Sequence, residues 1–241
     1  MNKSLLKIKQ LIPRTVLAQI GFFIAYSRLW GHSRQEQGIC VDGKGNPLPW
    51  ITYPAIEFLN TIDFSEAKVF EFGAGSSTLW WAKRVKLVCS VEREKDWFER
   101  LIPILPSNVS VALEPNELAY PDHINRHGCK FDVIVIDGAV RYPCMQSSLD
   151  YLDEDGIILL DNTEWYPNLA KMLRGLGLSQ IDFAGFGPIN AFPSCTSIFF
   201  RTNKWLMKKK NSPQWFPVGG RWIKAHDDSP LSEIDSSLLR K

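Results

Sequence analysis

The sequence predicts an α/β protein with a doubly wound, mostly parallel sheet of seven strands and helices on both faces. Between residues 68 and 201, short apolar runs of strand length alternate with stretches of helical periodicity. This alternation is typical of parallel strands joined by crossover helices. The chain has 241 residues, 45% of them hydrophobic, which is enough to bury one sizeable core of this kind.

The apolar runs give the expected elements in chain order. Five strands are expected at residues 68–72, 85–91, 109–113, 131–136 and 156–160, and two late strands at 180–183 and 196–201. Helices are expected at residues 55–61, 76–83, 95–101, 143–152 and 166–176. Together these elements define a predicted domain over residues 55–203.

Residues 1–54 are predicted to form a helical and loop extension, as a lid or on the substrate side. We expect one or two helices over residues 1–30 and an ordered loop over 31–54, where glycine and proline are frequent. The apolar run at 15–26 resembles a signal sequence, but Pro13 and Arg14 interrupt its approach and a bilayer span needs about 20 residues. We expect this region to pack on the domain, with peripheral membrane contact as the less favoured alternative.

Residues 204–241 are predicted to form an irregular tail, because they are rich in Lys, Pro, Ser and Gly. Its three tryptophans look exposed: Trp205, Trp215 and Trp222. The net charge of +2 gives no reason to expect nucleic acid as a partner. One basic cluster is expected to be a solvated loop; it comprises Arg201, Lys204, Lys208, Lys209 and Lys210.

The five cysteines are odd in number and scattered, without a Cys-x-x-Cys pair. This pattern favours reduced thiols and a cytoplasmic location. His123 and His127 have a spacing that suits a metal on a helix. Their neighbours include proline, aspartate, asparagine and glycine, so we expect a loop there and no zinc site.

The first strand runs into a glycine-rich turn at residues 71–78. Gly73 and Gly75 allow the backbone to approach a ligand, and the amides that open the next helix favour an anionic group. Glu92 follows Gly73 by 19 residues at the end of the second strand, where an acid accepts hydrogen bonds from ribose hydroxyls. The turn therefore predicts a nucleoside ligand.

A dinucleotide site shares this acid but normally has a third glycine, where this chain has Thr78. Glu71 at the strand end is a poor neighbour for a pyrophosphate and a good one for an ammonium group. A nicotinamide-dependent oxidoreductase is therefore the second choice, and a nucleotide-binding protein without catalysis is the third.

The run Glu71-Phe72-Gly73-Ala74-Gly75 resembles the first motif of the class I methyltransferases that use S-adenosylmethionine (SAM), a Rossmann-like family. The resemblance extends over residues 68–162 and implies that Glu71, Gly73 and Gly75 surround the methionine part of SAM and that Glu92 binds its ribose. Adenine contacts are expected near Glu114. The predicted cofactor-binding residues are Glu71, Gly73, Gly75, Ser76, Ser77, Glu92, Glu114 and Asp137.

Oxygen-bearing side chains end the fourth and fifth strands. Asp137 follows one strand, and Asp161 and Asn162 follow the other; three such ligands suit Mg²⁺. The pattern is similar to that of metal-dependent catechol-type O-methyltransferases, although Val140 stands where that family has a lysine. We therefore expect a possible Mg²⁺ site at Asp137, Asp161 and Asn162, and as the alternative a capping role for the latter two.

The resemblance implies methyl transfer to a hydroxyl or amine of a small molecule or a glycan, and the run from Asp137 to Arg141 is similar to bacterial methyltransferases acting on sugars or secondary metabolites. The expected catalytic residues are Asp137 and Glu164 as candidate bases and Arg141 as a group that orients the acceptor. Aromatic residues such as Trp50 and Trp165 are candidates for stacking on a sugar ring, with lid packing as the alternative. The acceptor and the oligomeric state are left open.

Overall fold

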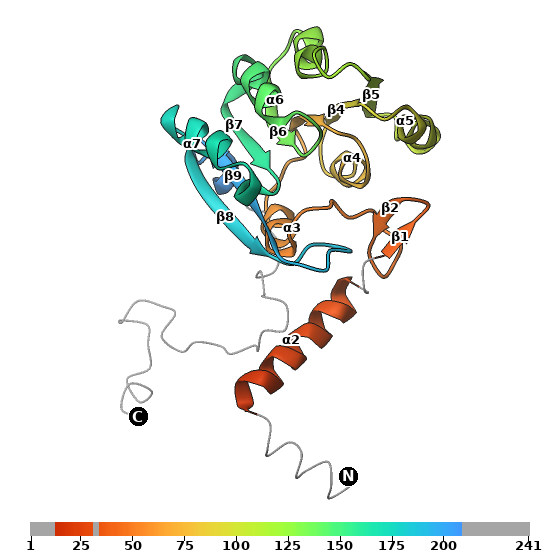
Figure 1. The fold of residues 1–241 in the computed structure, drawn as a ribbon, viewed down its shortest axis with the longest axis vertical. Helices are drawn as coiled ribbons and strands as arrows, with labels where there is room; N and C mark the ends of the chain where they lie inside the picture. Colours follow the sequence, from red (N-terminus) through yellow and green to blue (C-terminus); the bar gives the residue numbers. More distant parts are fainter. Residues whose placement is uncertain (1–12, 31–33, 209–241) are drawn as a thin grey trace, which may run out of the picture. The chain divides into compact units, whose positions relative to one another are not determined.

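The predicted seven-stranded sheet is present in the computed structural model, which describes residues 13–30 and 34–208 (Figure 1). The strand order is β5-β4-β3-β6-β7-β9-β8. Strands β3 to β7 are parallel, and β9 lies antiparallel between β7 and β8. The strands are β3 Lys68–Phe72, β4 Leu87–Glu92, β5 Val109–Leu113, β6 Phe131–Ile136, β7 Leu152–Leu160, β8 Ser179–Gly185 and β9 Ser194–Phe200.

The helices occupy the predicted gaps with shifts of a few residues. They are α3 Tyr53–Asn60, α4 Ser76–Ala82, α5 Lys95–Leu101, α6 Arg141–Ser148, α7 Pro167–Gly175 and a short α8 Lys204–Met207. Proline near the start favours α3 and α7. Backbone N–H groups in a first helical turn have no partner within the helix, so proline, which has no N–H, loses no hydrogen bond there. Short 3₁₀ helices lie at Ile102–Ile104, Pro121–His127, Leu149–Tyr151 and Thr163–Trp165.

The two faces of the sheet have different surroundings. Phe70 and Phe72 on β3 belong to a large apolar cluster to which α6 and α7 contribute, for example through Met145 and Leu173. Successive side chains of a strand point to opposite faces, so Glu71 between these phenylalanines points the other way, towards the start of α4. The fold thus places one carboxylate at the carboxyl end of the central strand.

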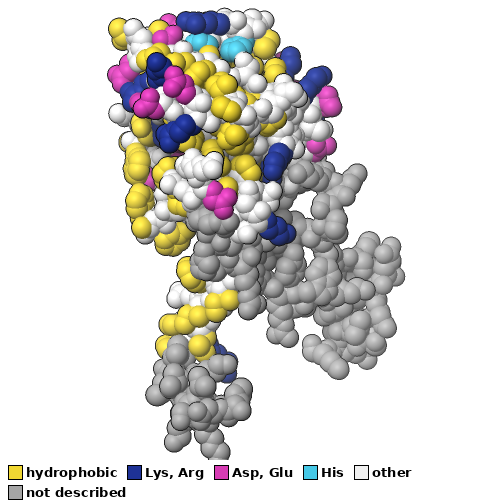
Figure 2. Space-filling model, turned by 90° about the vertical axis from the view of Figure 1, so that its right-hand side faces the viewer, with side chains coloured by type: hydrophobic (Ala, Val, Ile, Leu, Met, Phe, Trp, Pro, Cys, Tyr) yellow, Lys and Arg dark blue, Asp and Glu magenta, His cyan; other side chains and the backbone are white. Residues whose placement is uncertain are grey.

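The chain divides into two units, Met1–Leu29 with Gln214–Lys241, and Trp30–Pro213. Helix α2, Arg14–Trp30, belongs almost wholly to the first unit, and exposed apolar side chains such as Val16, Ile20 and Phe23 lie along it (Figure 2). Among the described residues, no helix combines the length and apolar character that crossing a membrane requires. Whether residues 1–30 pack on the domain or touch a membrane stays a prediction.

Two parts of the second unit differ from the expected loop and tail. Within residues 31–54, β1 (Arg34–Glu36) and β2 (Ile39–Val41) form an antiparallel hairpin. Its two-residue turn has positive φ at both Gln37 (52°) and Gly38 (87°), the geometry that matches strand twist. The sequence reading was wrong here because glycine and proline around the hairpin outweighed its short apolar strand.

Trp205 was expected to be exposed in the tail, and this expectation is wrong. The side chain is 3% exposed, and its ring stacks on Phe64 with a centroid distance of 5.2 Å. Lys204 beside it pairs with Asp155 at 2.6 Å. Trp215, Trp222, Lys209 and Lys210 lie outside the described residues.

The cysteine prediction is consistent with the structure, where all five cysteines are free thiols. His123 and His127 lie on the 3₁₀ helix Pro121–His127 rather than in a loop, and burial lowers the pKa of both. The described residues form no cluster of three metal-binding side chains.

Candidate functional site

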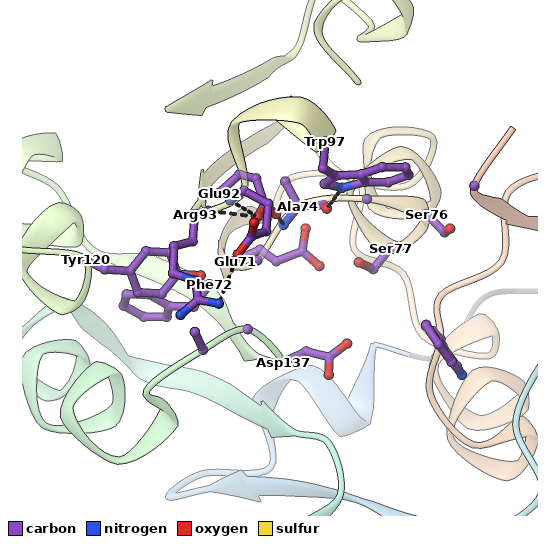
Figure 3. A pocket seen from close by; sticks show the side chains of 17 residues that line it. Glu71, Phe72, Ala74, Ser76, Ser77, Glu92, Arg93, Trp97, Tyr120 and Asp137 are labelled. Atoms are coloured by element: carbon purple, nitrogen blue, oxygen red, sulfur yellow. Dashed lines mark hydrogen bonds and ion pairs between the residues drawn. The ribbon is translucent and has the colours of Figure 1, made fainter. Parts of the chain in front are cut away.

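A cavity of about 410 Å³ lies at the carboxyl ends of β3, β4 and β6 (Figure 3). Open α/β sheets place their ligand crevice at this edge. Of the predicted site residues, seven line the cavity: Glu71, Gly73, Gly75, Ser76, Ser77, Glu92 and Asp137. The topology thus brings residues that are up to 66 positions apart, from 71 to 137, around one space.

Gly73 makes the floor of this cavity possible. Its φ of +95° lies in the region that side chains with a Cβ rarely adopt. A Cβ there would lie 3.2 Å from the Cα of Gly138 in the loop after β6. The glycine-rich turn and the loop that carries Asp137 therefore approach each other at backbone distance.

Glu71 is a buried carboxylate at the end of β3. Its Oε2 accepts hydrogen bonds from the hydroxyl of Thr78 and, at 3.4 Å, from that of Ser90. Its Oε1 is buried and has no hydrogen-bond partner among the described residues. Burial raises the pKa of Glu71 to about 7, and nearby hydroxyl groups offset only part of this increase.

Thr78 explains why this turn lacks the third glycine of a dinucleotide fingerprint. Its Oγ1 accepts a hydrogen bond from the backbone N–H of Gly75 at 2.8 Å and donates one to Glu71. The threonine therefore fixes both the turn and the carboxylate, which a glycine cannot do.

Glu92 is held by the backbone around it. Its Oε2 accepts from the N–H of Ala74 at 3.0 Å, and its Oε1 accepts from those of Arg93 and Glu94, both at 2.8 Å. A carboxylate oxygen accepts about two hydrogen bonds, so Oε2 retains capacity for a ligand hydroxyl. This arrangement fits the predicted role of Glu92 towards a ribose.

Asp137 faces the same cavity from the end of β6 (Figure 3). Burial, followed by the charge of Asp161, raises the pKa of Asp137 well above its usual value. Arg141 opposes this increase through an ion pair with Asp137 at 3.1 Å. Asp137 is thus a carboxylate with raised proton affinity beside a permanently charged guanidinium.

Arg141 joins the loops that follow β6 and β7. Its Nε donates to the carbonyl of Gly138 (3.1 Å), and its Nη2 donates to the carbonyl (3.0 Å) and Oδ1 (3.1 Å) of Asp137. Its Nη1 donates to the carbonyl of Asp161 and to Oδ1 of Asn162 (3.3 Å). All five N–H groups of a guanidinium are therefore used within the protein, and Arg141 is a positioning residue.

The expected Mg²⁺ site is not supported by these contacts. Oδ1 of Asp137 and of Asn162 both bind Arg141, and Oδ1 of Asp161 accepts from the hydroxyl of Thr196 at 2.6 Å. The guanidinium supplies the positive charge that a cation would supply, so this donor set does not fit a resident metal. The alternative gave Asp161 and Asn162 a capping and loop-fixing role. Asn162 precedes the 3₁₀ helix Thr163–Trp165 but its side chain makes no capping hydrogen bond, whereas the contacts with Arg141 and Thr196 agree with the loop-fixing part.

Two further predicted residues lie outside the cavity lining. Oε2 of Glu164 accepts from the backbone N–H of Cys195 at 3.0 Å, and Oε2 of Glu114 pairs with Arg126 at 3.3 Å. Ser76 lines the cavity, but its Oγ accepts from the backbone N–H of Cys40 at 2.7 Å. It therefore connects the glycine-rich turn to the hairpin.

Several lining residues were not predicted from the sequence. Trp97 on α5 donates from Nε1 to the carbonyl of Ala74 at 2.6 Å (Figure 3). A Cβ on Gly38 would lie 2.7 Å from the Trp97 ring, so the hairpin turn packs directly on the indole. Tyr120 also lines the cavity, as does Trp50, which the sequence suggested only as a stacking residue for a sugar ring. No local motif marks these residues, because tertiary packing alone brings them to the turn.

Similar folds are found among solved methyltransferases. One is a precorrin-6y C5,15-methyltransferase from Geobacter metallireducens, with a TM-score of 0.50 and 12% identity over 62% of this chain and 87% of that chain. The fold is that of a Rossmann-like methyltransferase.

Two other solved structures are the O-methyltransferase TomG from Streptomyces achromogenes, in complex with SAM, and a methyltransferase from Pyrococcus furiosus. Their TM-scores are 0.49 and 0.48, with 15% and 18% identity. The matches cover 61% of this chain and 76% of TomG, and 79% of this chain and 99% of the Pyrococcus protein. No family model and no curated protein sequence matches the chain.

Proposed function

We propose that this protein is a SAM-dependent methyltransferase that acts on a hydroxyl group of a small molecule or glycan. The observation that carries the proposal is the unpartnered, buried Oε1 of Glu71, which belongs to a side chain that lines the cavity. A buried carboxylate oxygen without a donor is costly. A ligand ammonium such as that of SAM removes this cost.

The charges around the cavity support a cationic ligand. Four carboxylates line it: Glu71, Glu92, Glu94 and Asp137. Arg93, which also lines it, already pairs with Glu94 and Glu117. SAM carries a sulfonium, an ammonium and one carboxylate and is therefore cationic, whereas the pyrophosphate of a dinucleotide would be repelled.

The topology also favours this function over an oxidoreductase. A dinucleotide-binding sheet has the order 3-2-1-4-5-6 with its strands mostly parallel. Here the antiparallel β9 lies between β7 and β8, and Thr78 replaces the third glycine. Neither feature belongs to the dinucleotide pattern.

SAM supplies a methyl group on a positively charged sulfur. In our proposal Asp137 accepts the proton of the acceptor hydroxyl, and the hydroxyl oxygen forms a bond to the methyl carbon. The electrons of the broken carbon–sulfur bond remain on sulfur, which becomes a neutral thioether. The raised pKa of Asp137 makes it a stronger base than an ordinary aspartate, and Arg141 holds it in place.

Isothermal titration calorimetry with SAM, S-adenosylhomocysteine and NAD⁺ tests the cofactor. We expect the two sulfur nucleosides to bind, NAD⁺ to show no binding, and Glu71→Gln to weaken SAM binding. Glu66→Gln is the matched control, because it removes an acidic charge from an exposed side chain outside the lining. Binding of NAD⁺ alone would overturn the proposal.

Catalysis needs a second test, since a nucleotide-binding protein without activity also binds SAM. Incubating the protein with a cell lysate and isotopically labelled SAM should give a labelled product by mass spectrometry. The Asp137→Asn variant should give background labelling. If the wild-type protein gives only background labelling in every acceptor pool, methyltransferase activity is contradicted, and the protein is a nucleotide-binding protein without catalysis.

A further inference from the structure

Three large aromatic side chains are exposed on loops at the carboxyl edge of the sheet. Trp50, Trp165 and Phe192 are 48%, 59% and 51% exposed, and we call them the aromatic rim. The rings of Trp165 and Phe192 lie 6.4 Å apart between centroids. Exposed apolar groups clustered beside a cavity are typical of ligand sites.

One member of the aromatic rim lies at the cavity itself. Trp50 lines the cavity together with Asp137. Its Nε1 donates to Oδ1 of Asn190 at 2.8 Å, and Asn190 belongs to the β8–β9 loop that also carries Phe192. Trp50 thus connects the loop of Phe192 to the cavity that contains the carboxylate proposed as the base.

The β8–β9 loop is held in a fixed position. A Cβ on Gly187 would lie 2.8 Å from the carbonyl oxygen of Ile51, so the two segments meet at backbone distance. Thr52 continues this contact, with its N–H donating to Thr196 at 3.0 Å. Ile189 has a φ of +56°, a conformation that β-branched residues rarely adopt. Such conformations are found mainly where function requires them.

Two described carboxylates, Glu164 and Asp137, lie beside members of the rim. Glu164 precedes Trp165, and Asp137 shares the cavity lining with Trp50. The guanidinium of Arg141 uses its N–H groups within the protein. Arg93, which lines the cavity, is paired with Glu94 and Glu117. Among the described residues around the cavity and the Asp137 loop, both arginines are therefore already paired with carboxylates, and an anionic acceptor would meet negative charge.

We propose that the aromatic rim is the acceptor subsite and binds the apolar face of a neutral pyranoside ring, a proposal that rests on the function proposed above. A pyranose has a face of C–H groups that stacks on aromatic rings and an edge of hydroxyls that needs hydrogen bonds. The Nδ2 hydrogens of Asn190 and the carboxylate of Glu164 provide such partners. One ring hydroxyl then points to Asp137.

Saturation-transfer NMR on the full chain tests the subsite. The probes are the methyl glycosides of glucose, galactose, mannose and rhamnose, with methyl glucuronide and methyl galacturonide as anionic counterparts. We expect at least one neutral glycoside to bind, and neither uronide to do so. Equal or better binding of a uronide, or binding of no neutral glycoside, would overturn the proposal.

The variants Trp165→Ala and Phe192→Ala test the residues directly. Each should weaken binding of the neutral glycoside about tenfold, while Trp165→Phe should recover most of it. Leu176→Ala, which removes another exposed apolar side chain at the end of α7, is the control. Unchanged glycoside binding in both alanine variants would exclude the rim.

SAM binding separates failure of this inference from failure of the proposed function. Trp165 and Phe192 do not line the cavity, so their variants should bind SAM as the wild type does in calorimetry. If the wild-type protein does not bind SAM, the proposed methyltransferase function is contradicted. Normal SAM binding without glycoside binding contradicts only the acceptor subsite.

Discussion

Glu71 is a buried carboxylate and Asp137 is a half-buried one; they lie at the ends of adjacent strands and differ in how their charge is compensated. Asp137 has the guanidinium of Arg141 at 3.1 Å. Glu71 has only hydroxyl groups beside it, and one of its oxygens has no partner among the described residues. The protein supplies the cation at one site and leaves it to the ligand at the other.

This difference assigns separate tasks to the two halves of the sheet edge. A carboxylate that lacks a cation is suited to bind one, which fits the proposed cofactor side. A carboxylate fixed by a built-in cation keeps its orientation without a ligand, which fits a base that receives a proton. Substitutions at the two positions should therefore have different consequences.

The largest effect should come from Asp137→Asn. The asparagine amide cannot take up the proton of the substrate hydroxyl. We therefore expect kcat to fall about 10³-fold while SAM affinity changes less than about threefold. In the wild type, kcat should rise with pH through the raised pKa of Asp137 and then level, because the base must be ionised. Stopped assays from pH 5 to 9 measure this profile, and equal loss of SAM affinity would contradict the division of tasks.

Arg141→Met should have the next largest effect. It leaves Asp137 and Asp161 without their cation. Breaking a fully buried pair costs about 3–5 kcal/mol, and the loss here should be smaller because the side chains of Arg141 and Asp137 are 10% and 24% exposed. The loss should be smaller at pH 5 than at pH 8, because both carboxylates have raised pKa values and take up protons. Urea unfolding at the two pH values measures it.

Arg141→Lys is the control for that experiment, since it retains the charge but not the five-donor arrangement. The Arg141→Lys variant should be more stable than Arg141→Met and less stable than the wild type. If Arg141→Met unfolds at the same urea concentration as the wild type at pH 8, the built-in cation is not what stabilises these loops.

Glu71→Gln should weaken SAM binding about 100-fold, because a buried charge pair with the ammonium is lost. It should also change stability in the free protein. Since the pKa of Glu71 rises from 4.5 to about 7 on folding, wild-type stability should fall by about 3 kcal/mol as pH rises through this window and then level. Urea titrations of both proteins from pH 4 to 8 check the sign.

In those titrations Glu71→Gln has no ionisable carboxyl at this position, so its free energy of unfolding should not fall as pH rises in the way expected for the wild type. The two proteins should therefore differ most above pH 7, with the variant the more stable. A wild type that becomes more stable between pH 5 and 7 relative to Glu71→Gln would show that a cation already compensates Glu71.

The smallest expected effect is that of a chelator. Since Arg141 binds Asp137 and Asn162 directly, EDTA should leave both the melting temperature and the rate of methyl transfer unchanged. A rate that falls with EDTA and returns with Mg²⁺ would mean that this edge binds a cation which the Arg141 contacts do not predict.

The cavity lining on the proposed cofactor side could be predicted because most of its residues are local in sequence. Gly73, Thr78 and Glu71 lie within one strand, turn and helix, and their spacing alone fixes their relation. Glu92 follows from one strand pairing, of β3 with β4. The overall sheet was equally accessible, since alternating apolar runs determine it.

The acceptor side was harder to predict because its contacts depend on tertiary structure. The hydrogen-bond acceptors of Arg141 come from the loops that follow β6 and β7. The register between these two strands determines that the loops meet at Arg141. Glu114 shows the same limit. Its backbone N–H reaches Glu92, yet its side chain turns to Arg126, a direction that spacing does not reveal.

The contact between the hairpin and Trp97 determines how far the chain can be shortened. The indole packs against Gly38 on one side and, at 3.5 Å, against the position of a Cβ on Gly75. Cutting the chain at residue 55, where the alternating pattern begins, would remove one wall of the cavity and expose this tryptophan. A fragment that keeps the site must therefore include the hairpin from Arg34 onwards. Substitutions in the hairpin turn should likewise change the affinity for the proposed cofactor.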